Sequence, residues 1–228
     1  SAPWRKPTTD IQVHSRSRQG KRARQATASP SCWIMPADVC RFGHGTRLND
    51  ILAGYAKAAP DLIAAYEAFD PERLYAPVLG LFPKTRSRIV DIGAGTGRDA
   101  AWFAGQGHDV VAVEPVSELR GPGRQLHHDA RITWLDDRLP HLEMAQTLAP
   151  FDLAVLSGVW QHIDDREREI AMDSLGQVVG IDGLLVMSLR HGPGASGRHA
   201  FPVKASETID AAAGCGFALL RQTQVDSV

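Results

Sequence analysis

A glycine-rich stretch and an acidic residue that follows it are the positions of the sequence best suited to chemistry. The segment Val90–Gly97 joins an apolar stretch to one of helical composition, with glycines at alternate positions. Such glycines let the backbone turn sharply and approach a ligand with no Cβ in the way. Glu114 lies 21 residues after Gly93, at the end of the next apolar stretch. A carboxylate there can accept hydrogen bonds from both hydroxyls of a ribose, so the pair predicts a site for a nucleoside-containing cofactor.

The spacing of the glycines separates two classes of cofactor. Dinucleotide enzymes use G-x-G-x-x-G, in which the third glycine lets the helix pack closely. Counted from Gly93, that third glycine would fall on Arg98, so a nucleotide-dependent oxidoreductase is a disfavoured alternative. The pattern present is G-x-G-x-G preceded by Asp91, which is typical of enzymes that use S-adenosylmethionine (SAM).

The elements that must position these residues alternate along the chain from Arg88 onward. Short apolar segments predict strands at Arg88–Ile92, Asp109–Val113, Arg131–Leu135, Phe151–Leu156, Gly183–Leu189 and Phe217–Arg221. Helical spacing separates them, at Arg98–Gln106, Val116–His127, His141–Leu148, Asp165–Val179 and Lys204–Cys215. Continuous apolar strands separated by helices are typical of an α/β fold whose parallel sheet is covered on both faces.

Residues 88–221 resemble a class I SAM-dependent methyltransferase. The resemblance rests on the glycine pattern, on its place between a strand and a helix, and on Glu114. It implies a Rossmann-like, doubly wound, mostly parallel sheet in the order 3-2-1-4-5-7-6, with SAM over the carboxyl ends of strands 1, 2 and 4. S-adenosylhomocysteine (SAH) would be the product. A methyltransferase-like module without catalysis, or one that binds nucleic acid, remains the alternative.

The resemblance also implies which residues hold SAM. It assigns the methionine and ribose parts to the first motif, the ribose hydroxyls to Glu114, and the adenine amino group to an acid after the third strand, Asp136 before Asp137. The residues after the fourth strand, from Ser157 to Trp160, would contact the methionine part. The expected cofactor-binding residues are Asp91, Gly93, Ala94, Gly95, Gly97, Glu114, Pro115, Asp136, Asp137, Ser157 and Trp160.

Candidate catalytic residues are His162 and His191, which follow the fourth and fifth predicted strands. A base is needed only when the methyl acceptor must lose a proton. The Asn/Asp-Pro-Pro-aromatic motif of enzymes that methylate base amines is missing after the fourth strand, and so are a Pro-Cys nucleophile and a paired-glutamate loop. We therefore expect a small-molecule acceptor rather than nucleic acid.

Composition and cysteine content bear on membrane association, redox compartment and metal binding. Apolar residues make up 43% of the 228-residue chain, and no run approaches the ~20 apolar residues that span a bilayer. We expect no membrane partner. Cys32, Cys40 and Cys215 form no close pair, which favours a reducing compartment and a cytoplasmic location. A metal site built on Cys32, Cys40 and His44 is disfavoured, because a fourth ligand is missing and the spacing is irregular.

Three regions are expected. Residues 1–46 are predicted to be a basic, disordered extension, since residues 1–47 carry nine basic and two acidic side chains and little apolar content. Residues 47–87 are expected to form a helical lid, with helices at Leu48–Ala59, Pro60–Phe69 and Leu74–Phe82. Residues 88–228 would be the SAM-binding domain. Because the chain stops at Val228, soon after the sixth strand, the C-terminal antiparallel strand of the family is expected to be missing or truncated, which would leave an open slot in the sheet.

Overall fold

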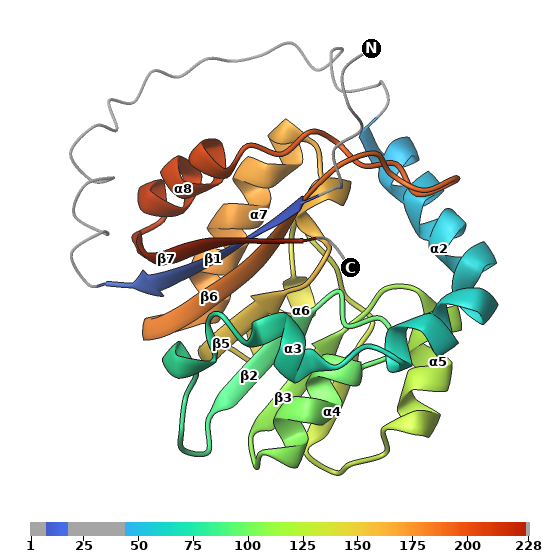
Figure 1. Ribbon diagram of the computed structural model, residues 1–228, viewed down its shortest axis with the longest axis horizontal. Coiled ribbons are helices and arrows are strands. Elements are labelled where there is room, and N and C mark those ends of the chain that lie inside the picture. The colour runs from blue at the N-terminus through green and yellow to red at the C-terminus, as the bar shows by residue number, and fades with distance from the viewer. Residues whose placement is uncertain (1–7, 18–43, 227–228) are drawn as a thin grey trace.

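The computed structural model describes residues 8–17 and 44–226. They form a seven-stranded sheet in the order β4-β3-β2-β5-β6-β1-β7, with helices against both faces (Figure 1). The prediction of a Rossmann-like α/β fold is confirmed. No helix within these described ranges is both long enough and apolar enough to cross a bilayer.

Five parallel strands make up the part of the sheet that carries the glycine-rich turn. They are β2 (Arg88–Ile92), β3 (Asp109–Val113), β4 (Ile132–Leu135), β5 (Phe151–Leu156) and β6 (Val179–His191). Strand β2 lies in the middle, paired with β3 on one side and β5 on the other. The carboxyl ends of β2, β3 and β5 therefore lie side by side at one edge of the sheet.

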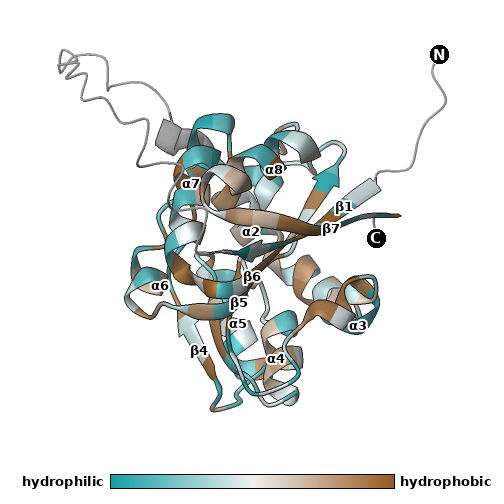
Figure 2. Ribbon diagram, turned by 90° about the vertical axis from the view of Figure 1, so that its left-hand side faces the viewer, coloured by the Kyte–Doolittle hydropathy of each residue, from teal (hydrophilic) through white to brown (hydrophobic). Residues whose placement is uncertain are grey.

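Alternate residues of a strand point to opposite faces of the sheet. Because helices cover both faces, the inward positions of these strands are apolar on both sides. Val90 and Ile92 pack in one buried cluster, whose helices are α6 (Glu143–Thr147), α7 (Asp165–Val178) and α8 (Ala205–Gly214). Ile89 packs in the opposite cluster, against α3 (Pro71–Tyr75) and α4 (Arg98–Gly105). The hydropathy colouring in Figure 2 shows hydrophobic residues along the inner strands and hydrophilic residues scattered over the helices.

A strand from near the start of the chain corrects the prediction about the far side of the sheet. β1 (Thr8–Arg16) pairs antiparallel with β6 on one side and with β7 (Phe217–Asp226) on the other. The C-terminal strand β7 is present, so the expectation of a missing or truncated C-terminal strand is wrong. The slot between β6 and β7 is filled by β1, as Figure 1 shows.

The same strand corrects the expectation that residues 1–46 are a disordered extension. Residues 8–16 lie inside the sheet, with the side chains of Ile11 and Val13 fully buried. Strand β1 is paired on both edges, and both of its faces are covered, so its polar residues Gln12 and His14 are buried as well. Residues 18–43 lie outside the described residues, together with Cys32, Cys40 and most of the expected extension.

The helices before β2 differ from the prediction in their boundaries. The two helices expected on either side of Pro60 are one helix, α2 (His44–Glu67). A proline removes one hydrogen bond inside a helix, but residues on both sides of Pro60, among them Leu52 and Ile63, pack against Val116 and Leu119 of the α5 region. This packing holds α2 together across the proline and lays it over α5 (Ser117–Leu126). The third expected helix is divided into α3 and the short turn η2 (Leu79–Leu81).

Candidate functional site

The turn between β2 and α4 can be built only from glycine at its key positions. Gly93, Gly95 and Gly97 all have positive φ, at 74°, 58° and 80°. A Cβ on Gly93 would lie 2.4 Å from Cγ2 of Val159, and one on Gly97 would lie 2.4 Å from Cη2 of Trp134. The turn is thus packed against Trp134 of β4 and against the segment that follows β5, and its backbone lies close to the edge of the sheet.

Glu114 meets this turn from the end of the neighbouring strand. Its side chain is only 5% exposed. One carboxylate oxygen accepts a 2.7 Å hydrogen bond from the Gly95 amide, and the other accepts a 2.8 Å hydrogen bond from the Val116 amide. Burial raises the pKa of Glu114, while the two amides act in the opposite direction and favour the charged form. The acid is therefore held in place by backbone donors, and each oxygen keeps acceptor capacity for a ligand hydroxyl.

A cavity of about 620 Å³ lies over the carboxyl ends of these strands. Its volume is in the range of sites that enclose small ligands and cofactors. Of the residues that the sequence predicted for the site, nine line the cavity: Asp91, Gly93, Ala94, Gly95, Glu114, Pro115, Asp137, Ser157 and His162. Gly97, Asp136, Trp160 and His191 do not line it.

Asp91 is a buried carboxylate in the wall of this cavity. It is 2% exposed, and its Oδ2 atom has no hydrogen-bond partner. Burial raises the pKa of Asp91 well above its ordinary value, and the nearby Asp99 raises it further. Asp99 itself is satisfied, because the Tyr75 hydroxyl and Nε of Arg98 each donate to it at 2.7 Å. Asp91 thus offers an unused oxygen to a donor or a cationic group in the cavity.

The two acids after β4 are separated by the structure. The side chain of Asp136 is 66% exposed and forms a 2.8 Å ion pair with Arg120, outside the cavity lining. Asp137 lines the cavity, and its Oδ2 accepts hydrogen bonds of 2.9 Å from the amides of Met144 and Ala145 at the start of α6. The expectation placed Asp136 before Asp137, whereas the position in the cavity favours Asp137.

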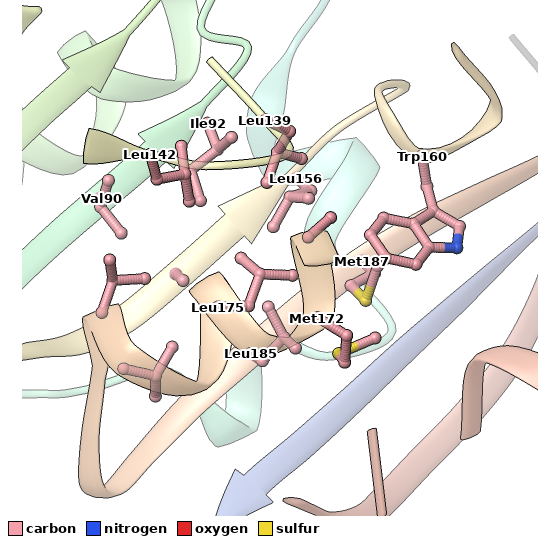
Figure 3. Packing of buried hydrophobic residues seen from close by; sticks show 14 of the residues in the cluster. Val90, Ile92, Leu139, Leu142, Leu156, Trp160, Met172, Leu175, Leu185 and Met187 are labelled. Carbon is pink, nitrogen blue, oxygen red and sulfur yellow. The ribbon is translucent and has the colours of Figure 1, made fainter. Parts of the chain in front are cut away.

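Trp160 corrects a further expectation, that its indole walls the cofactor site. It is 1% exposed and belongs to the core under β5 and β6, where Figure 3 shows its ring turned toward Met187. The neighbouring Val159 lines the cavity instead. Val159 is the N-cap of the short turn η3 (Trp160–His162), and Trp160 is the first residue of that turn.

His191 also lies away from the cavity. Its Nε2 atom forms a 2.8 Å contact with Oδ2 of Asp10 on β1. The two residues lie near the paired ends of β6 and β1, so the contact ties the N-terminal strand to the sheet. The candidate catalytic role of His191 therefore has no support from its position.

His162 stands in a defined hydrogen-bonded arrangement at the cavity. Its Nδ1 atom lies 2.7 Å from the carbonyl oxygen of His199, and its Nε2 atom lies 2.8 Å from the Tyr55 hydroxyl. Because a carbonyl can only accept, Nδ1 carries the hydrogen, Nε2 of the neutral ring is an acceptor, and the Tyr55 hydroxyl donates to it. Burial lowers the pKa of His162, and the charges of Arg198 and Arg190 lower it further. The neutral imidazole is thus the stable form near pH 7.

Two tyrosines of α2 cover the cavity opposite the sheet. The ring of Tyr66 lies over the glycine-rich turn, since a Cβ on Gly95 would be 3.4 Å from its Cδ2 atom. Tyr55 meets the His162 ring edge to face, with centroids 5.4 Å apart. Burial raises the pKa of both tyrosines, so both hydroxyls stay protonated. Both tyrosines belong to the segment 47–87 that was expected to form a helical lid, and both line the cavity.

Sequence reasoning missed Arg198 and Gln161, which also line the cavity. Arg198 comes from the loop between β6 and α8, and its guanidinium carbon lies 5.2 Å from the centre of the Tyr55 ring. A loop arginine carries no motif, and only the contact between this loop and α2 brings it to the site. Gln161 was overlooked because it is a buried polar residue of η3 that lies between the two predicted site residues Trp160 and His162.

Comparison with known proteins agrees with this geometry. A family model described as "Methyltransferase domain" matches residues 66–201. An uncharacterized methyltransferase of Mycobacterium tuberculosis is 28% identical over 145 residues, which is 53% of this chain and 58% of the relative. One from Exiguobacterium sibiricum is 27% identical over 152 residues, or 61% of this chain and 65% of the relative. The chain thus spans less than two thirds of the length of these relatives.

Two solved structures share the fold. A TehB-like SAM-dependent methyltransferase of Corynebacterium glutamicum superposes with a TM-score of 0.50 at 24% identity, covering 72% of this chain and 82% of that one. The 1,6-didemethyltoxoflavin-N1-methyltransferase of Burkholderia thailandensis superposes with a TM-score of 0.60 at 19% identity, covering 81% and 86%. The latter was solved with 1,6-didemethyltoxoflavin and SAH bound. At these identities the similarity establishes the fold.

Proposed function

The chain belongs to the class I SAM-dependent methyltransferase family, and we propose that it transfers a methyl group from SAM to a small-molecule acceptor. The observation that carries the proposal is the 2.7 Å hydrogen bond from the Gly95 amide to Glu114. It holds the glycine-rich turn and the buried acid Glu114 together at one edge of the sheet, within one cavity.

The residues of the cavity fit SAM on three counts. Gly93, Ala94 and Gly95 line the cavity, so the turn brings backbone with little side-chain bulk to the ligand space. Glu114 is oriented by two amides and keeps acceptor capacity for ribose hydroxyls. Asp91 presents a buried oxygen without a partner, which suits the ammonium of the methionine part or the positive charge of the sulfonium.

When bound, SAM supplies an electrophilic methyl group on a sulfonium, which an acceptor attacks in line. The contribution of the chain is then mainly to hold the acceptor against the methyl carbon and to exclude water. Tyr55 and Tyr66 cover the cavity from α2, and the 3.4 Å approach of the Tyr66 ring to a Cβ position on Gly95 leaves little space for water there.

For an acceptor that must lose a proton, His162 is the proposed base. Its Nδ1–H is held by the His199 carbonyl, so the lone pair of Nε2 points to the Tyr55 hydroxyl. Tyr55 can pass its own proton to Nε2 while it takes the proton of the acceptor, because its hydroxyl is both a donor and an acceptor. A neutral imidazole near pH 7 suits this role, and burial keeps it neutral.

A small-molecule acceptor is supported by the enclosure of the site. Helix α2 and the loop before α8 cover the cavity. The side of α2 that carries Tyr55 packs on Val116 and Leu119. The structural neighbour from Burkholderia thailandensis was solved with a small heterocyclic compound, 1,6-didemethyltoxoflavin. The similarity does not assign that compound to this chain as a substrate. It shows that the shared fold can accommodate an acceptor of that size.

The test is turnover of methyl-labelled SAM against a panel of small metabolites. We expect label to appear in one class of acceptor, with production of SAH, and to be lost in the Glu114→Ala variant. The Glu118→Ala variant is the matched control, because Glu118 is exposed on α5 and its carboxylate accepts a hydrogen bond from the Ser117 hydroxyl. Transfer to DNA or RNA, with none to any metabolite, would contradict the small-molecule acceptor.

A further inference from the structure

Two arginine side chains at the corner of the cavity near His162 have no acidic partner among the described residues. Arg190 lies near the end of β6, and Arg198 lies in the loop that follows. Both line the cavity, and neither takes part in an ion pair within the described ranges 8–17 and 44–226. Other arginines of this fold are neutralised: Arg98 pairs with Asp99 at 2.7 Å, and Arg120 with Asp136 at 2.8 Å.

Arg198 is held in place although it lacks a counter-charge. Its guanidinium carbon lies 5.2 Å from the centre of the Tyr55 ring, and its Nε atom is buried without a hydrogen-bond partner. The guanidinium also hydrogen-bonds the hydroxyls of Tyr55 and Tyr66. An arginine has five N–H donors, so further donors remain to bind an anion. The buried Nε–H is therefore an unsatisfied donor within the site.

The loop that carries Arg198 is docked rather than free. A Cβ on Gly54 of α2 would lie 1.9 Å from the carbonyl oxygen of Gly197, so the loop and α2 are in direct backbone contact. The carbonyl of His199 accepts from His162 at 2.7 Å, and the amide of Phe201 donates to the Gln161 carbonyl at 2.7 Å. These contacts on either side of Arg198 fix its backbone against the cavity.

The corner is therefore positively charged. Asp91 and Asp99 also line the cavity, but Asp99 is bound by Tyr75 and Arg98, and burial favours the neutral form of Asp91. Glu114 is bound by two backbone amides, and Asp137 is bound by the first amides of α6. The charges of Arg190 and Arg198 both reach His162, where they oppose protonation of the ring. An anion bound between the two guanidiniums would satisfy the free donors and cancel this repulsion.

We propose that Arg190 and Arg198 form a subsite for a carboxylate or phosphate group of the methyl acceptor, which makes the acceptor an acidic small molecule. This inference rests on the proposed function, because it assigns the corner to the acceptor rather than to the cofactor. It also gives the acceptor a second effect. Its negative charge would strengthen His162 as a base only when the substrate is in place.

The test uses the full chain saturated with SAH and titrated separately with inorganic phosphate and with acetate. Binding is measured by calorimetry, and the His162 imidazole signals are followed by NMR over a pH series. We expect at least one probe to bind the SAH-loaded protein and to raise the pKa of His162. The stronger of the two probes identifies the acidic group as a phosphate or a carboxylate.

Variants connect the binding to the two arginines. Arg198→Gln and Arg190→Gln should each weaken the bound probe by about tenfold or more, the loss of a charged hydrogen-bonding partner, with SAH affinity unchanged. Arg198→Lys should keep part of the affinity. Arg131→Gln is the matched control, because Arg131 lies at the opposite end of β4 and pairs with Asp129. Arg190→Gln removes an exposed side chain, so it keeps the test valid if the Arg198 variant fails to fold.

Three results would overturn the proposal. The first is the absence of binding by either probe. The second is displacement of SAH by phosphate or acetate, or loss of SAH affinity in Arg198→Gln, which would assign the arginines to the methionine carboxylate of the cofactor. The third is an unchanged probe affinity in both arginine variants. If SAH itself does not bind, the proposed function fails, and titration of the free protein with phosphate still decides whether the arginine pair binds anions.

Discussion

The backbone amide of Gly95 donates a 2.7 Å hydrogen bond to the carboxylate of Glu114. The two residues belong to the ends of adjacent parallel strands, β2 and β3. Their contact shows that the glycine-rich turn and the acid act as one unit, in which the acid orders the turn and the turn orients the acid.

Replacement of Glu114 by alanine is expected to weaken SAH binding by roughly 1–3 kcal/mol, because the ribose hydroxyls lose their acceptor. Titration calorimetry measures the change. The variant also frees the amides of Gly95 and Val116, so Glu114→Gln, which keeps an acceptor oxygen, should lose less. An unchanged affinity in Glu114→Ala would remove this residue from the site.

Gly97→Ala is expected to destabilise the fold by about 1–2 kcal/mol or more, from its left-handed backbone alone. The φ of Gly97 is 80°, and the new Cβ would also collide with the Trp134 ring. Gly105→Ala is the control, since a Cβ there meets nothing within 4 Å and lies at the end of α4. Thermal unfolding of the two variants should differ clearly. Equal stability would mean that the turn does not need glycine at position 97.

The pH dependence of methyl transfer should report His162, for an acceptor that loses a proton. Since burial lowers the pKa of His162 below its ordinary value of 6.5, the neutral base persists at neutral pH, and the rate should fall only as the pH drops below 6.5. His162→Gln should lower kcat and remove this acidic limb, and Tyr55→Phe should lower kcat with SAH affinity retained. A profile that is the same in wild type and His162→Gln would exclude His162 as the base.

The stability of the fold should depend on pH through His14 of β1. The ring is fully buried, its Nε2 contacts Oε1 of Gln12 at 3.1 Å, and its Nδ1 has no partner. Burial lowers the pKa of His14 from 6.5 to about 4. Between pH 6.5 and 4 the imidazole is protonated in the unfolded chain but stays neutral in the folded chain. The contribution of His14 to the free energy of unfolding is therefore fully present above pH 6.5 and is lost as the pH falls toward 4. The loss is about 3 kcal/mol in total.

Denaturant unfolding at several pH values measures this loss. His14→Phe should flatten the dependence between pH 6.5 and 4, whereas His128→Gln, at an exposed position, should leave it unchanged. If the His14 variant keeps the full slope, the ring does not stay neutral in the folded sheet.

Strand β1 should contribute to the stability of the whole sheet, because β7 is joined to β6 only through it. Ile11→Ala is expected to cost about 2–5 kcal/mol, the range for a large buried side chain, since Ile11 is 1% exposed between its neighbours. Leu220→Ala on β7 is the control, as that side chain is 51% exposed. A cost for Ile11 no greater than that for Leu220 would show that β1 is not docked as described.

The sequence predicted the parallel part of the sheet and the cofactor end of the site because local patterns specify both. Apolar strands covered on two faces stay apolar in the sequence, and the turn at Gly93 to Gly97 requires a residue without a side chain. Glu114 follows its strand at a spacing that the βαβ unit imposes. Each of these features leaves a local pattern in the sequence.

Strand β1 escaped prediction for the opposite reason. Between Thr8 and Arg16 only Ile11 and Val13 are apolar, and the polar Gln12 and His14 beside them are buried as well, so the strand lacks the continuous apolar run of the other inner strands. Arg198 was missed because a backbone contact between Gly54 and Gly197 brings its loop to the cavity. Trp160 and Val159 were not distinguished because both follow β5 at the start of η3, and only one of them lines the cavity.

Calorimetric titration of the full chain with SAH and with NAD decides whether the Gly95–Glu114 unit binds a SAM-type cofactor. We expect SAH to bind at one site per chain and NAD to give no binding heat. Binding of NAD with no binding of SAH would contradict this expectation, and would assign the glycine-rich turn to a dinucleotide.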